Sequence, residues 1–115
     1  MRHGFIKTAA VTPKVQVADP GANAQEIIRL AAEAAGNGAK LIVFPELCIT
    51  GYTCGDLFLQ ELLLKRAKEE LFRVIRETAQ LDALIFAGLP WEKDGKLYNV
   101  AAAFQGGRLL GLVPK

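Results

Sequence analysis

The feature that most constrains the fold is a short apolar run, LIVF at residues 41–44, that lies between turn-forming residues. Gly36, Asn37 and Gly38 precede it, and Pro45 follows it directly. Consecutive apolar residues bounded in this way predict a strand covered on both faces, as in the interior of a layered α/β domain. Segments that supply these layers should therefore lie elsewhere in the chain.

Two helical patterns flank this strand. Asp19 and Pro20 form a typical helix start, because the aspartate can cap the helix and the proline lacks an N–H that would be unpaired there. Apolar residues then recur at helical spacing to about residue 35. A second amphipathic pattern covers residues 60–81, with charged residues opposite the apolar stripe. The predicted strand therefore lies between two predicted helices.

Strand patterns also occupy both ends of the chain, at residues 5–11, 83–89, 97–104 and 108–113. Pro90 ends the second of these patterns, and Asp94 with Gly95 is a strong hairpin signal before the third. This order of elements predicts an α/β fold (α+β in some schemes) with a mixed β-sheet and helices on one face. Because the last strand stops at Pro114 with nothing after it to cover the sheet, we expect a truncated domain.

Composition narrows the class of protein. Hydrophobic residues make up 51% of the 115 residues, which is enough to bury a core. The 14 basic and 12 acidic residues are interspersed, so nothing indicates a nucleic acid or an anionic membrane as a partner. No run approaches the roughly 18 apolar residues of a membrane-spanning helix. Two cysteines and the single His3 are too few for a disulfide framework or a structural zinc site. A soluble, cytoplasmic protein is the expectation.

Glu46 is the strongest catalytic candidate. It follows the buried strand at residues 41–44 and Pro45, and layered α/β folds gather reactive groups at the carboxyl ends of their strands. Partial removal from water would suit this carboxylate to general-base chemistry. The alternative is an ordinary loop carboxylate that is solvated or caps the next turn.

Three further residues are weaker candidates. Lys115 also follows an apolar strand ended by proline, and two strands of one sheet can bring a carboxylate and an ammonium group into one cleft, although a terminal lysine is usually exposed. Cys48 and Cys54 are candidate nucleophiles by residue type. No histidine lies near them in the sequence, and we expect buried or incidental thiols.

Two stretches carry a resemblance to a known family. Residues 41–47 (LIVFPEL), followed by Thr50, Gly51 and Tyr52, resemble the first signature of the nitrilase, or carbon–nitrogen hydrolase, superfamily. Residues 51–58 (GYTCGDLF) are similar to the glutaminase domain of the glutamine-dependent NAD synthetases. The resemblance implies that residues 1–115 are the N-terminal portion of a nitrilase-type α-β-β-α sandwich, with the rest of that domain and a synthetase domain absent.

The resemblance also implies site residues. Glu46 and Lys115 match two members of a Glu–Lys–Cys triad, in which the glutamate is the base and the lysine stabilises the oxyanion. The nucleophilic cysteine of that triad lies beyond the chain end, and neither Cys48 nor Cys54 matches it. Tyr52 matches a tyrosine of the substrate pocket or tunnel. The 115-residue chain alone is therefore expected to be inactive.

Substrate and partners follow in the same way. The resemblance implies glutamine as substrate, release of ammonia to the absent synthetase domain, and ATP and magnesium for that domain, with no cofactor or metal in this portion. It also implies a homo-oligomer in the full-length form. Two alternatives stay open: a free-standing amidase of the same superfamily that acts on another small amide, and a non-catalytic assembly module of the same fold.

Overall fold

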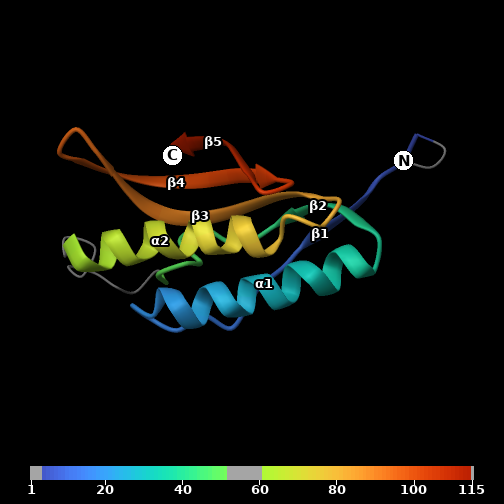
Figure 1. Ribbon diagram of the computed structural model, residues 1–115, viewed down its shortest axis with the longest axis horizontal. Helices are drawn as coiled ribbons and strands as arrows, with labels where there is room; N and C mark the ends of the chain where they lie inside the picture. Colours follow the sequence, from blue (N-terminus) through green and yellow to red (C-terminus); the bar gives the residue numbers. More distant parts are fainter. Residues whose placement is uncertain (1–3, 52–60, 115) are drawn as a thin grey trace.

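The computed structural model describes residues 4–51 and 61–114 of the chain (Figure 1). Its elements, in chain order, are β1 (Lys7–Ala10), α1 (Pro20–Gly36), β2 (Ala39–Val43), α2 (Glu61–Glu77), β3 (Leu84–Lys93), β4 (Lys96–Gln105) and β5 (Arg108–Pro114). The five strands form one sheet in the order β1-β2-β3-β4-β5. β1, β2 and β3 are parallel, whereas β3, β4 and β5 form an antiparallel meander. The predicted mixed-sheet α/β fold is confirmed.

The predicted turns form for the expected reasons. Asp94 and Gly95 adopt φ angles of 53° and 76°, which is the left-handed pair that a tight hairpin between β3 and β4 requires. The Asp19 side chain accepts a hydrogen bond of 3.1 Å from the Ala22 amide and so caps α1. At the other end of α1, Gly38 takes a φ of 92°, which allows the chain to turn directly into β2.

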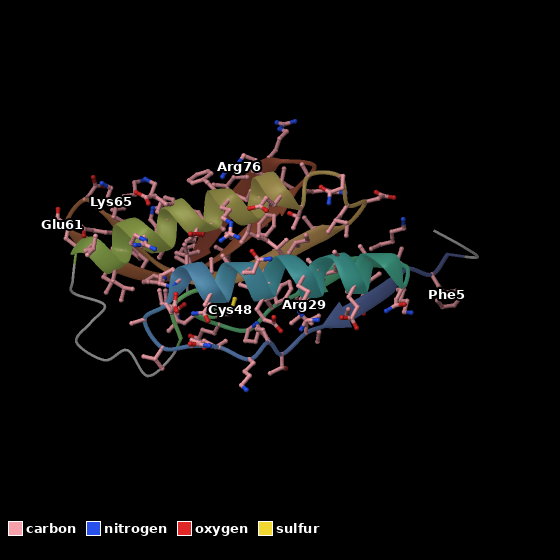
Figure 2. All side chains as sticks on the ribbon, turned by 60° about the horizontal axis from the view of Figure 1, so that its bottom comes forward. Phe5, Arg29, Cys48, Glu61, Lys65 and Arg76 are labelled. Atoms are coloured by element: carbon pink, nitrogen blue, oxygen red, sulfur yellow. The ribbon has the colours of Figure 1, made fainter. Side chains whose placement is uncertain are left out.

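Both helices pack on one face of the sheet, and the hydrophobic core lies between the two layers (Figure 1). The helices and the sheet contribute fully buried side chains to this core, among them Ile27, Leu71, Ile42, Ile85, Leu89 and Phe104. Charged side chains such as Arg29, Lys65 and Arg76 lie on the exposed outer surfaces of the helices (Figure 2). Within residues 4–51 and 61–114, neither helix is long and apolar enough to cross a membrane.

The opposite face of the sheet carries no helix in the described residues. Val43 of β2 is 41% exposed and Val113 of β5 is 57% exposed, so the prediction that the strand at residues 41–44 is covered on both faces is wrong for this chain. The pattern LIVF is typical of a two-sided environment, but residues 4–51 and 61–114 supply a layer for one side only. We call this surface the open face.

The expected end of the third strand at Pro90 is also wrong. β3 continues through Pro90 to Lys93, and Pro90 pairs with Asn99 of β4. The proline is tolerated because β2 pairs with β3 only beside residues 84–86. Among residues 4–51 and 61–114, no strand pairs with Pro90 on the β2 side, so the missing N–H interrupts no described ladder of backbone hydrogen bonds.

Candidate active site

Glu46 lies in the loop that leaves the carboxyl end of β2. The Phe44 amide donates a 2.9 Å hydrogen bond to the Phe86 carbonyl, and the Ile49 amide donates one of 3.2 Å to the Gly88 carbonyl. These bonds hold the loop alongside β3 at both of its ends. Glu46 lies between them and is partly buried.

Gly88 allows the Glu46 backbone to reach this position. A Cβ atom at Gly88 would lie 2.9 Å from both Cα and C of Glu46, and closer still to the Leu47 amide nitrogen. Real Cβ atoms do not approach backbone atoms so closely, so only glycine fits at this point of β3. Leu47 itself takes a φ of 53°, a left-handed conformation that is uncommon for a leucine and typical of functional sites where it occurs.

Asn23 of α1 ties a second loop to this one. Its Nδ2 donates hydrogen bonds of 2.7 Å to the Gln16 carbonyl and 2.8 Å to the Ile49 carbonyl, while its Oδ1 accepts one of 2.7 Å from the Gln16 amide. The side chain is 1% exposed. Because all these partners are backbone groups, Asn23 satisfies buried polar groups of two loops and fixes the loop after Glu46 to the helix layer.

Asn99 of β4 contacts the carboxylate directly. Its side-chain Nδ2 donates a hydrogen bond to Oε1 of Glu46. The pairings of Gly88 with Ala101 and of Pro90 with Asn99 place Asn99 on the same face of the sheet as the Cβ direction of Gly88. Residues 53 positions apart in the sequence therefore meet on the open face.

A cavity of about 350 Å³ opens at this point. Glu46, Gly88 and Asn99 line it together with Val113 and Pro114 of β5. Its size lies within the range of small-molecule sites. The structure therefore places the predicted base in a hollow that also receives the end of β5, the segment that leads to Lys115.

The other predicted site residues are not placed. Lys115 and Tyr52 lie outside the described residues, as does Cys54. No group of three or more His, Cys, Asp or Glu side chains that could hold a metal ion occurs in the described ranges, residues 4–51 and 61–114. Of the residues predicted for the site, Glu46 is the one that the structure describes.

Cys48 is buried, as expected. It is 1% exposed, lies in the interior near the Glu46 loop (Figure 2), and has its Sγ 3.7 Å from the Gly88 carbonyl. Burial raises the pKa of this thiol to about 11. A thiol that stays protonated near neutral pH is a poor nucleophile, which agrees with the prediction that Cys48 is not catalytic.

Alkylation of Cys48 is expected to be very slow in the folded protein. With a pKa of about 11, roughly one thiol in a thousand is ionised at pH 8. Peptide mass spectrometry after iodoacetamide treatment, with and without urea, measures this rate separately from that of Cys54. An unfolded chain ionises the thiol near its ordinary pKa of about 8.5, so stability should fall as the pH rises above that value. Fast labelling of Cys48 without urea would contradict the conclusion that this thiol is buried and protonated in the folded protein.

Three residues that shape the candidate site were not predicted from the sequence: Gly88, Asn99 and Asn23. Gly88 had a signal, because an isolated glycine inside a strand pattern often marks a close backbone approach. Asn99 is a polar residue in the predicted strand at residues 97–104, whose other residues are apolar or aromatic, and Asn23 is a buried amide on the inner face of a helix. Neither pattern identifies its partner, which comes from a distant part of the chain.

Glu46 thus lies at the end of a strand, in a cavity on one face of a mixed α/β sheet. Residues 7–114 match the carbon–nitrogen hydrolase family, and the chain belongs to that family. Within it, the chain is similar to the glutamine-dependent NAD(+) synthetase of Mycobacterium tuberculosis strain H37Rv, with 37% identity over 114 residues. That match covers 99% of this chain and 17% of the relative.

Solved structures agree with this assignment. The crystal structure of a glutamine-dependent NAD(+) synthetase from Cytophaga hutchinsonii has a TM-score of 0.89 and 29% identity, over 96% of this chain and 19% of that one. An amidase from Nesterenkonia sp. shares the fold, with a TM-score of 0.81 and 24% identity over 100% of this chain and 44% of the amidase. The chain thus spans less than a fifth of the length of the two synthetases, and the nitrilase-superfamily fold is confirmed.

Proposed function

We propose that residues 1–115 are the N-terminal portion of the glutaminase domain of a glutamine-dependent NAD synthetase. In this function, glutamine is hydrolysed to glutamate and ammonia, and the ammonia supplies the ATP-dependent amidation of deamido-NAD. The observation that carries the proposal is the placement of Glu46 at the carboxyl end of β2, in the cavity that it shares with Asn99 and the end of β5.

The chemistry assigns a role to each site residue. Glu46 takes the proton of a cysteine thiol supplied by sequence outside this chain, and the thiolate attacks the side-chain amide carbon of glutamine. Lys115 stabilises the oxyanion of the tetrahedral intermediate. Collapse of the tetrahedral intermediate breaks the C–N bond. With a proton returned from Glu46, this step releases ammonia and leaves a thioester. Water, deprotonated by Glu46, then hydrolyses the thioester to glutamate and the free thiol.

The neighbours of the unplaced residues support these roles. Pro114 lines the cavity, and Lys115 follows it directly. Tyr52 comes immediately after Gly51, whose amide donates a 2.7 Å hydrogen bond to the Leu47 carbonyl, in the loop that carries Glu46. We assign Tyr52 to the substrate pocket or tunnel, and assign ATP and magnesium to the synthetase domain.

The test is an isotope transfer with the longer protein that contains this chain. Incubation with glutamine labelled with ¹⁵N in its side-chain amide, deamido-NAD, ATP and magnesium is expected to give glutamate and NAD that carries the label. Hydrolysis of glutamine without labelled NAD would indicate a free-standing amidase. No hydrolysis of glutamine or of other small amides would indicate a non-catalytic assembly module and overturn the proposal.

A further inference from the structure

Asn99 is placed to control the side chain of Glu46 rather than its backbone. The Glu46 backbone is fixed by its close approach to Gly88 and by the bonds on either side of the loop. The carboxylate, in contrast, lies two methylene groups away from that backbone and needs a contact of its own to hold one orientation. The Nδ2 group of Asn99 makes such a contact, at Oε1.

The type of residue at this position matters chemically. An amide N–H donates to an ionised carboxylate and favours the charged form, which is the form that accepts a proton. It does so without a positive charge of its own, so it weakens the basicity of the carboxylate less than a lysine or arginine would. The donor, Asn99, belongs to a regular strand, β4. Its pairing partner in β3 is Pro90, which has no backbone N–H.

We propose that Asn99 is a positioning residue that holds Oε1 of Glu46 in one orientation and keeps the carboxylate ionised, in the form that receives the thiol proton. This inference rests on the proposed function of Glu46 as the general base. In the first step the S–H bond breaks and an O–H bond forms on the Glu46 carboxylate. Oε1 keeps its hydrogen bond from Asn99 throughout, so the base does not have to rotate between successive proton transfers.

The test uses Asn99→Leu and Asn99→Asp in the longer protein, with glutamine hydrolysis followed across pH. Loss of a hydrogen bond to a charged group is expected to lower kcat roughly ten- to a hundredfold in Asn99→Leu, with KM nearly unchanged. The acidic limb of the pH profile should move to higher pH in both variants, and by about one to three pH units in Asn99→Asp because two carboxylates then face each other. Ammonia-dependent NAD synthesis should not change.

Gln105→Asp is the matched control, since it adds the same charge to an exposed position of the same strand, β4. It should leave the profile of glutamine hydrolysis unchanged. A residue with a structural role alone would lower the rate equally at every pH, so an unmoved acidic limb in both Asn99 variants overturns the proposal.

A second readout separates this proposal from the proposed function. The ¹³C signal of the Glu46 carboxyl group, assigned by its absence in Glu46→Gln, reports ionisation whether or not glutamine is hydrolysed. Its titration midpoint should be higher in Asn99→Leu than in the unchanged protein. An unaltered midpoint overturns the role of Asn99 even in an active enzyme, whereas a raised midpoint in an inactive protein overturns the proposed function alone.

Discussion

Replacement of Glu46 by glutamine is expected to reduce glutamine-dependent NAD synthesis by the longer protein by roughly a hundred- to ten-thousandfold, the usual contribution of a general base. Synthesis from added ammonia should stay within about twofold, because in the proposed function the ammonia-dependent reaction does not use this cavity. The change preserves shape: the side chain of the new glutamine can turn its oxygen toward Nδ2 of Asn99 and keep that hydrogen bond. Basicity is then the property that is lost.

Initial rates with the two nitrogen sources, compared at equal protein concentration, measure this effect. Glu33→Gln is a suitable control, because it removes an exposed carboxylate on α1 whose nearest cation, Arg29, is 3.6 Å away. Equal losses with glutamine and with ammonia would show general misfolding or a defect in synthesis. Full glutamine-dependent activity in Glu46→Gln would remove Glu46 from the mechanism.

Substitution of Gly88 by alanine should be strongly destabilising, because the added methyl group has no room. The added Cβ would meet the Glu46 backbone at 2.9 Å, and backbone held by hydrogen bonds on both sides cannot move aside cheaply. Overpacking of this kind costs about 1–3 kcal/mol of stability. A displacement of the Glu46 loop by about 1 Å should also lower glutamine hydrolysis roughly a hundredfold.

Two measurements test this second prediction: the thermal unfolding temperature, and the initial rates of NAD synthesis with glutamine and with ammonia. Gly36→Ala is the matched control, because Gly36 ends α1 with nothing within 4 Å of the position of a new Cβ. That variant should be as stable as the unchanged protein or slightly more so. If Gly88→Ala is equally harmless, the close approach between β3 and the Glu46 loop does not exist in solution.

The fold was accessible from sequence because its signals are local. The cap at Asp19, the apolar stripes of the two helices and the left-handed turn at Asp94 and Gly95 each depend on a few adjacent residues. Where the prediction failed, a non-local fact decided: Pro90 stays inside β3 because β2 has already ended beside it. The prediction that β2 is covered on both faces was wrong for the same kind of reason, because such coverage depends on layers that other segments must provide.

For the candidate site, the sequence by itself determined that a carboxylate follows an apolar strand, and it predicted that Cys48 is a buried or incidental thiol. Only the tertiary structure brought Glu46 against Gly88 and Asn99, and joined the Glu46 loop to α1 through Asn23. The reason is physical. A helix cap or a turn is satisfied by groups a few residues away. A hydrogen bond between the loop after β2 and a residue of β4 depends instead on sheet register, which is set by packing across the whole domain.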